Sequence, residues 1–365
     1  MRASKFAMVL GLGIGLILAV AYASFQGDSI GKHLVPLAHA SEPIKIVFAC
    51  WEGPEGSHGR TVGQWAKELE KRSGGRVKVE VAYGGAMGPT PEHYHLAATG
   101  VADAAEVGLP FTPGQFPMSE VMEMPINGHG LKAEDLSVVF YKLYEKGYLK
   151  KDFKDVVVLW VSTINPYDFQ MRNVPVRRVE DLKGKKIRVT GKIHTEIAKL
   201  LGAIPVGMPG TEIYGALEKG ITDGVFTDWS AVWTFRYEKL IKYVTKTHFG
   251  CMGFAFVMNR AKYESLPKDI QQIIAEMRPK YARLDGRNDD ETAEMGKKLA
   301  LDAGVQIIRL SEAETERFSA RLAPLWQKWI AEGEKRGLPR KKMLEDLYDI
   351  LKGMGVKVPF IGYTP

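Results

Sequence analysis

Apolar residues follow two different periods along the middle of the chain. Runs that alternate at every second residue predict strands, and stretches with apolar residues three or four positions apart predict helices between them. Val77–Ala82 alternates as Val-Lys-Val-Glu-Val-Ala, which predicts a strand with one buried face, and Gly59–Ser73 predicts an amphipathic helix. Further strands are predicted at Ile44–Cys50, Ala104–Val107, Val156–Val161, Lys186–Thr190, Asp223–Thr227, Tyr243–His248 and Phe254–Met258. Such alternation of strands and helices predicts α/β layers with parallel pairing.

The last hundred residues change to a helical pattern. A long helix is predicted over Lys268–Leu301, bent at Pro279. Ser311 opens the sequence Ser-Glu-Ala-Glu, which has the spacing of a capping box, ahead of a helix that extends to about Arg336. A last helix is predicted over Lys341–Gly353.

Length and composition narrow the class of protein. A chain of 365 residues is too long for one ordinary core and predicts two domains. The 45% of hydrophobic and 25% of charged residues are typical of a soluble globular protein and argue against global disorder and against a polytopic membrane protein. The net charge of +7 is a small surplus, and its charges are interspersed without a dense basic block. Nucleic acid is therefore not predicted as a partner, whereas an acidic small molecule would be attracted.

The first residues have the pattern of a secretory signal peptide. Arg2 and Lys5 precede an apolar run at Ala7–Tyr22, which is shorter than the ~20 residues that a membrane-spanning helix needs. An Ala-Tyr-Ala triplet predicts a signal peptide over residues 1–23, and a second triplet, Ala-His-Ala, allows cleavage as late as residue 40. An uncleaved anchor helix is the alternative. The expected location of the mature protein is the periplasm.

Two cysteines cannot form a disulfide framework. Cys50 and Cys251 would be able to pair in an oxidising compartment. Each lies in an apolar, strand-like stretch, where a thiol behaves as a small hydrophobic group. We expect both to be free and buried, with a disulfide as the alternative.

Motifs of common enzymes are absent from the sequence. It contains no P-loop, no His-Glu-x-x-His, no Gly-x-Ser-x-Gly and no Cys-x-x-Cys. The pair His93 and His95 is expected to lie at a solvated helix start, because positions two apart on a helix do not share a face. Four carboxylates are expected to be surface charges: Glu120, Glu123, Asp289 and Asp290. These features do not predict catalysis.

Arg188 is the residue with the clearest functional pattern. It lies between Ile187 and Val189 in a short predicted strand, so its side chain points away from both apolar neighbours. Ligands of open α/β sheets bind at the carboxyl ends of strands, and a guanidinium suits bidentate contact with a carboxylate. A surface arginine paired with a nearby acid is the alternative.

An ordered set of motifs surrounds this arginine and resembles the solute-binding proteins of TRAP (tripartite ATP-independent periplasmic) transporters. The segments that carry the resemblance are Ser73–Val81, Gly84–Gly88, Glu180–Val189, Leu201–Ala203, Pro205, Glu212–Gly224, Val257–Arg260 and Ser265–Pro267. The resemblance covers nearly the whole mature chain. It implies a two-lobed, periplasmic-binding-protein-like α/β fold with mixed sheets, a long domain-spanning helix and C-terminal helices. Lobe I would comprise residues 41–163 and 253–290, and lobe II residues 164–252 and 291–365.

The resemblance also implies how a ligand would be held. In the family, the arginine matching Arg188 forms a salt bridge with the carboxylate of the substrate. Thr227 matches a position of polar contact where some members carry Asn. Members of the sialic-acid type carry a second arginine, whose position corresponds to Asp168 here. Because Asp168 is not basic, this argues against the sialic-acid subtype. Arg172 is close enough in sequence to substitute for that arginine.

Aromatic residues gather around the predicted cleft and would form an apolar wall behind the carboxylate. They are Trp51, Phe111, Tyr167, Phe226, Trp229 and Trp233. Packing in the core is the alternative for each ring. Residues near Gly85 would complete the cage from the opposite lobe. Glu52 and His58, in the loop after the first strand, could bind polar ligand groups, but each taken alone is expected to face solvent.

Together these features predict a periplasmic protein that captures a small organic acid as its lobes close and delivers it to the TRAP membrane permease. No cofactor is expected, and a cation that bridges ligand and protein has no support in the sequence. The alternatives are a ligand-sensing accessory protein for a membrane receptor and an enzyme on the same fold. Dicarboxylates, keto acids, aromatic acids and sulfonates are all compatible with the sequence as the bound acid.

Overall fold

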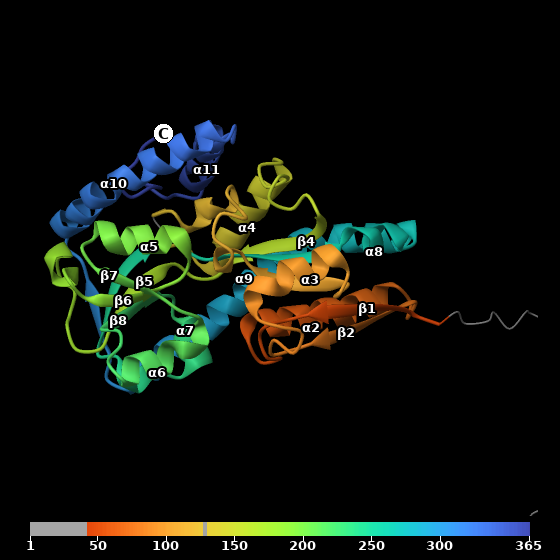
Figure 1. Cartoon of the computed structure of the whole chain (residues 1–365), viewed down its shortest axis with the longest axis horizontal. Coiled ribbons are helices and arrows are strands. Elements are labelled where there is room, and N and C mark those ends of the chain that lie inside the picture. Colours follow the sequence, from red (N-terminus) through yellow and green to blue (C-terminus); the bar gives the residue numbers. More distant parts are fainter. Residues whose placement is uncertain (1–41, 127–129) are drawn as a thin grey trace, which may run out of the picture. The chain divides into compact units, whose positions relative to one another are not determined.

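Two mixed β-sheets organise the protein (Figure 1). The computed structural model describes residues 42–126 and 130–365, so the predicted signal peptide and its cleavage sites lie outside the described residues. We call the five-stranded sheet with its helices lobe I and the six-stranded sheet with its helices lobe II.

The sheet of lobe I has the strand order β2-β1-β3-β10-β4. Its strands are β1 (Ile44–Ala49), β2 (Val77–Ala82), β3 (Ala104–Gly108), β4 (Val156–Thr163) and β10 (Gly253–Asn259). β1 pairs in parallel with β2 and β3, and β10 runs antiparallel to β3 and β4. On β2, Val77 and Val79 are buried while Lys78 and Glu80 are exposed, which confirms the predicted alternation.

The sheet of lobe II has the order β11-β9-β5-β8-β6-β7. Its strands are β5 (Tyr167–Met171), β6 (Lys186–Val189), β7 (Ile204–Gly207), β8 (Gly224–Thr227), β9 (Tyr243–Phe249) and β11 (Gln306–Arg309). β6 is parallel to β7 and β8, whereas β5 is antiparallel to β8 and β9. The prediction of parallel pairing is therefore wrong for β5 and β10. Both strands enter their sheet directly from the other lobe, through short links at residues 164–166 and 250–252, instead of following a neighbouring strand of the same sheet through the helical crossover that joins parallel strands.

Helices cover both sheets. Those of lobe I are α2 (Ser57–Arg72), α3 (His93–Thr99), α4 (Ala133–Glu145) and α8 (Arg260–Ser265). Those of lobe II are α5 (Gly191–Leu200), α6 (Ile213–Glu218) and α7 (Ser230–Phe235). α2 buries Val62, Trp65 and Leu69 against the sheet of lobe I, as its helical period predicts. His93 at the start of α3 is buried, with its ring nitrogens 2.9 and 3.1 Å from the backbone oxygens of Glu106 and Gly88, so the expectation of a solvated position is wrong for this residue.

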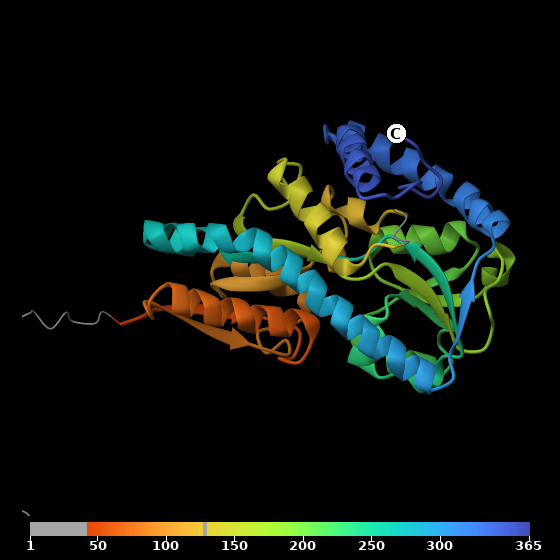
Figure 2. The ribbon, with the colours of Figure 1, turned by 180° about the vertical axis from the view of Figure 1, so that it is seen from behind.

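A single long helix, α9 (Lys268–Asp302), runs along both lobes and changes direction along its length (Figure 2). It continues through Pro279, and it packs against α2 and α4 of lobe I and against α7 of lobe II. The predicted domain-spanning helix is confirmed.

The C-terminal helices α10 (Glu312–Lys335) and α11 (Arg340–Gly353) pack against α5 and α4, respectively. Ser311 caps α10, because its side chain accepts a hydrogen bond from the Glu314 N–H, as predicted. Arg340 is buried and donates to the Glu120 carboxylate at 2.9 Å. Glu120 is therefore an interior group.

Glu123 and Asp289 are buried as well, and Asp290 is half-buried. The expectation of surface charge for this set is wrong. A carboxylate is accepted in the interior where donors from distant segments meet it, and the sequence pattern does not show those donors.

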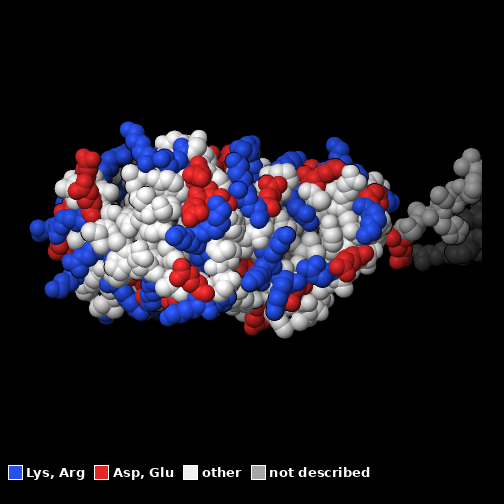
Figure 3. All heavy atoms as spheres, turned by 90° about the horizontal axis from the view of Figure 1, so that it is seen from above, with Lys and Arg blue, Asp and Glu red and all other residues white. Residues whose placement is uncertain are grey.

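The cysteines and the distribution of charge on the surface are as predicted from the sequence. Cys50 and Cys251 are buried and free, which confirms the expectation. On the face shown in Figure 3, basic and acidic side chains are intermixed. Within the described ranges, no helix combines the length and the apolar character that crossing a bilayer requires.

A candidate ligand-binding cleft

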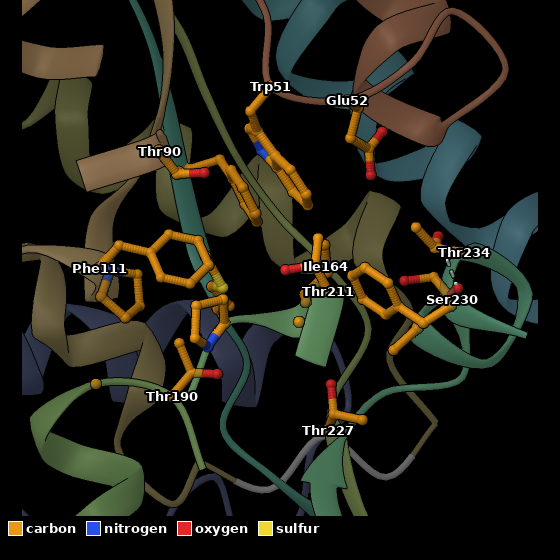
Figure 4. A pocket seen from close by; sticks show the side chains of 18 of the residues that line it. Trp51, Glu52, Thr90, Phe111, Ile164, Thr190, Thr211, Thr227, Ser230 and Thr234 are labelled. Atoms are coloured by element: carbon orange, nitrogen blue, oxygen red, sulfur yellow. Dashed lines mark hydrogen bonds between the residues drawn. The ribbon is translucent and has the colours of Figure 1, made fainter. Parts of the chain in front are cut away.

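A cavity of about 760 Å³ is lined by residues of both lobes (Figure 4). Much of its lining follows directly after β1, β2 and β3 in lobe I and after β6, β7 and β8 in lobe II. Those are carboxyl ends of parallel strands, where ligands of open α/β sheets bind. The polar lining residues are Glu52, Ser57, His58, Thr90, Arg188, Thr190, Thr211, Thr227, Asp228, Ser230, Thr234 and Asp289.

Arg188 lines this cavity from β6 and is only 3% exposed. Its neighbours Ile187 and Val189 belong to the hydrophobic core, as strand alternation predicts. The guanidinium donates from Nε and Nη2 to the backbone oxygen of Met208, at 3.1 and 2.9 Å. Among the described residues, no carboxylate forms an ion pair with it, and burial lowers the pKa of Arg188 from its ordinary value. Arg188 is therefore a buried cation beside a cavity, not a surface arginine paired with an acid.

Thr227 and Asp228 lie beside each other at the end of β8 and line the same cavity. The Thr227 Oγ1 is 3.5 Å from the Asp228 Oδ1, and the Ser230 N–H donates to the Asp228 Oδ2 at 3.0 Å. Burial raises the pKa of Asp228 to about 6. Tyr167, at the start of β5, also lines the cavity, and burial raises the pKa of its hydroxyl.

Lobe I contributes aromatic rings and a glycine turn. The rings of Trp51 and Phe111 meet edge to face, with centroids 6.5 Å apart and an interplanar angle of 75°. Gly84 and Gly85 have φ angles of 68° and 71°, in the region that favours glycine, and their N–H groups donate to backbone oxygens of Glu52 and Cys50. This turn brings the end of β2 to the cavity beside the loop after β1.

Glu52 and His58 are 7% and 1% exposed, so the expectation that each faces solvent is wrong. The Glu52 Oε2 accepts hydrogen bonds from the N–H groups of His58, at 2.9 Å, and Gly59, at 3.4 Å, in the first turn of α2. The His58 Nδ1 lies 3.0 Å from the Asp285 Oδ2. Burial acts to lower the pKa of His58, but the charge and hydrogen bond of Asp285 outweigh it and raise this pKa well above its usual range.

Four of the residues predicted around the ligand do not line the cavity. Phe226 points to the opposite side of β8 from Thr227 and stacks on Phe169, with centroids 4.5 Å apart. Trp229 lines a smaller second cavity of about 230 Å³. Tyr167 begins β5, whereas Arg172 comes directly after its last residue. The Arg172 N–H donates to the Asp223 backbone oxygen at 2.9 Å. Trp233 is covered by the Arg236 guanidinium, 3.8 Å from its ring centroid.

Several lining residues were not predicted from the sequence, among them Asp228, Ser230, Met208, Phe235, Met252 and Phe254. Asp228 and Met208 come directly after predicted or observed strand ends, so their position in the sequence could have identified them. The others depend on how loops and the second lobe fold over the cavity. Among the described residues, no group of three or more His, Cys, Asp or Glu side chains is arranged to hold a metal ion.

A two-lobed α/β protein with a cavity between its lobes, lined from the carboxyl ends of its strands, has the architecture of a solute-binding protein. The profile of bacterial extracellular solute-binding protein family 7 (DctP) matches residues 50–332. The chain belongs to this family and is a TRAP solute-binding protein.

Similar proteins of known class support this family assignment. A solute-binding protein of Albidiferax ferrireducens is 27% identical over 310 residues, which cover 77% of this chain and 88% of the relative. A TRAP solute-binding protein of a marine metagenome, specific for aromatic acid ligands and solved with 3-hydroxybenzoate, is 29% identical with a TM-score of 0.79, covering 86% of this chain and 99% of its own. A TRAP solute-binding protein of Rhodoferax ferrireducens, solved with copurified benzoate, is 26% identical with a TM-score of 0.78, covering 85% of this chain and 98% of its own.

Proposed function

We propose that this protein binds a small organic acid between its lobes in the periplasm and delivers it to the membrane permease of a TRAP transporter. The observation that carries the proposal is the buried guanidinium of Arg188, which lines the cavity and has no carboxylate at ion-pair distance among the described residues, although the charges of Asp228 and Glu212 act on it. A buried charge is costly unless it is paired. The carboxylate of a ligand would provide the missing anion, and its planar geometry fits the guanidinium.

The remaining lining suits a ligand with an apolar body. Trp51, Phe111, Phe235 and Phe254 supply rings from both lobes, and a flat aromatic ligand would pack against them. Two relatives of similar structure were solved with aromatic acids. We therefore propose an aromatic monocarboxylate as the class of ligand.

Closure of the lobes would complete the site. The short links 164–166 and 250–252, together with α9, connect the two sheets, and such connections act as hinges in two-lobed receptors. A ligand that contacts Arg188 from lobe II and Trp51 from lobe I would favour the closed form by binding it more tightly than the open form.

The replacement Arg188→Ala tests this assignment. Titration calorimetry with benzoate and 3-hydroxybenzoate should show a loss of about 2–5 kcal/mol in binding, because the ligand carboxylate would be desolvated without a partner. Arg172→Ala is the matched control, since that arginine lies in the same lobe but outside the cavity lining, and it should bind like the wild type. Unchanged affinity in Arg188→Ala would refute the proposal.

A further inference from the structure

Three carboxylates line the cavity, and two of them already have their oxygen atoms occupied. Asp289 accepts hydrogen bonds from Asn165 at one oxygen and from Ser57 at the other, and Asp228 accepts from Thr227 and Ser230 in the same way. Each oxygen of these two acids therefore already has at least one donor from the protein.

Glu52 differs from both. Its Oε2 accepts the N–H groups of His58 and Gly59, but no described residue donates a hydrogen bond to its Oε1. The residue is 7% exposed, and Figure 4 shows its carboxylate directed into the cavity from lobe I. An ionised carboxylate oxygen can only accept hydrogen bonds, so Oε1 can take a donor that a ligand brings into the cavity. Lobe I, opposite Arg188, therefore presents a fixed acceptor to the cavity, and no described residue donates to its Oε1.

The surroundings of Glu52 hold its negative charge in place. The N–H groups at the start of α2, a 16-residue helix, favour an anion at that position. His58 is buried directly beside it, within hydrogen-bonding distance of Asp285. The carboxylate is thus oriented by the protein, which makes it suited to recognise one ligand group in one place.

We propose that Glu52 accepts a hydrogen bond from a hydroxyl group of the ligand, so that the protein selects hydroxylated monocarboxylates. The carboxylate of the ligand would lie at Arg188 in lobe II and its hydroxyl at Glu52 in lobe I. This inference rests on the proposed function for the carboxylate end of the ligand. A second carboxylate would meet the charge of Glu52 and be repelled, so dicarboxylates are disfavoured.

A neutral hydroxyl fits this position better than an ammonium group. The pKa of His58 is raised well above its usual range, which keeps a positive charge beside Glu52. An ammonium group would add a second cation next to this imidazolium. A hydroxyl donates its hydrogen bond without adding charge.

The test compares acids in matched pairs, with and without a hydroxyl, by titration calorimetry on the full mature chain. The pairs are benzoate with 3-hydroxybenzoate, phenylacetate with metahydroxyphenylacetate, and hexanoate with its terminal hydroxyl and terminal amino derivatives. Within every pair that binds, we expect the hydroxylated acid to bind about tenfold more tightly or better, because a hydrogen bond to a charged group is lost in its partner.

Variants then assign the preference to Glu52. In Glu52→Gln the amide oxygen can still accept from the start of α2, which places the NH₂ group in the cavity. The hydroxyl preference should fall to about twofold or less, and isophthalate, which carries a second carboxylate, should bind better relative to benzoate than it does in the wild type. Glu52→Ala should show the same loss of preference. Glu55→Ala removes an exposed acid of the same loop outside the cavity lining and should keep the wild-type preference.

The outcomes separate this inference from the function on which it rests. Acids that bind without a hydroxyl preference, or a preference that survives both Glu52 variants, would overturn the role of Glu52 while leaving the Arg188 site intact. Tighter binding of the amino derivative than of the hydroxyl derivative would show that Glu52 recognises a cationic donor, and it would also overturn the proposal. If none of the acids binds, the proposed function itself fails.

Discussion

Trp51 shows how a single residue of the cleft combines two roles. Its indole ring is half-buried, lines the cavity and meets Phe111 edge to face. Its backbone N–H donates to the buried Glu106 at 3.1 Å, which anchors the loop after β1 to the sheet. The side chain is therefore held against the cavity by a main-chain contact.

Replacing this ring should weaken aromatic ligands selectively. Trp51→Ala is expected to lower the affinity for benzoate and 3-hydroxybenzoate by about 1–3 kcal/mol, because a large apolar contact area is lost. Intrinsic fluorescence and calorimetry measure the effect. Trp233→Ala is the control, since that ring is covered by Arg236 and does not line the cavity. Equal losses in both variants would show that Trp51 acts through stability instead of contact.

At the scale of elements, α9 joins the lobes through close backbone contacts at two glycines. A Cβ at Gly286 would lie 2.4 Å from the Ala133 backbone oxygen at the start of α4, and one at Gly296 would lie 2.1 Å from the Trp229 backbone oxygen beside α7. Both distances are far below van der Waals contact, so only glycine allows the helices to approach this closely. The helix thus touches lobe I and lobe II at positions where a side chain would force it away.

Gly296→Ala should therefore destabilise the fold although alanine favours helices. We expect a loss of about 1–3 kcal/mol in the free energy of unfolding, as for overpacked interiors, measured by urea denaturation. Gly215→Ala in α6 is the matched control, because a Cβ there meets nothing within 4 Å, and it should be neutral or stabilising by up to about 1 kcal/mol. A neutral Gly296→Ala would show that α7 and α9 can separate without cost.

At the scale of the whole molecule, buried ionisable groups link stability to pH. Glu106 lies beneath the loop after β1, where it accepts from the Cys50 thiol and from the Trp51 N–H. Complete burial raises its pKa from 4.5 to about 8. Between these values the folded chain keeps a proton that the unfolded chain has lost, so stability falls as the pH rises. His58 acts in the same direction above pH 6.5, because the folded state also keeps its proton there.

We expect the free energy of unfolding to be lower at pH 8 than at pH 6.5. The titration of Glu106, which involves one proton per molecule, should account for about 2 kcal/mol of this decrease. Glu106→Gln retains an acceptor for Cys50 and Trp51 but cannot titrate, so its stability should fall less over the same interval. Urea denaturation at both pH values measures the difference. An identical decrease in the variant would assign the pH dependence to other groups.

The sequence by itself determined the types and order of most elements and the orientation of Arg188 away from its apolar neighbours Ile187 and Val189, because strand and helix periods are local properties of the chain. The burial of Arg188 beside a cavity came from the structure. It located β1, β2, β3, β4, β6, β8, β9 and β10 and the helices α2, α9, α10 and α11, but it named no strand at β5, β7 or β11. The lobe boundaries that it suggested within α9 and at the interlobe links remain a prediction.

Only the tertiary structure decided which polar groups are buried and which aromatic rings reach the cavity. His58 is held by Asp285, 227 positions away, and Glu120 by Arg340, 220 positions away. Trp229 comes two residues after β8, yet it lines the second cavity and not the one beside Arg188. Burial of a charge depends on donors that folding brings from distant segments, and local periodicity carries no information about them.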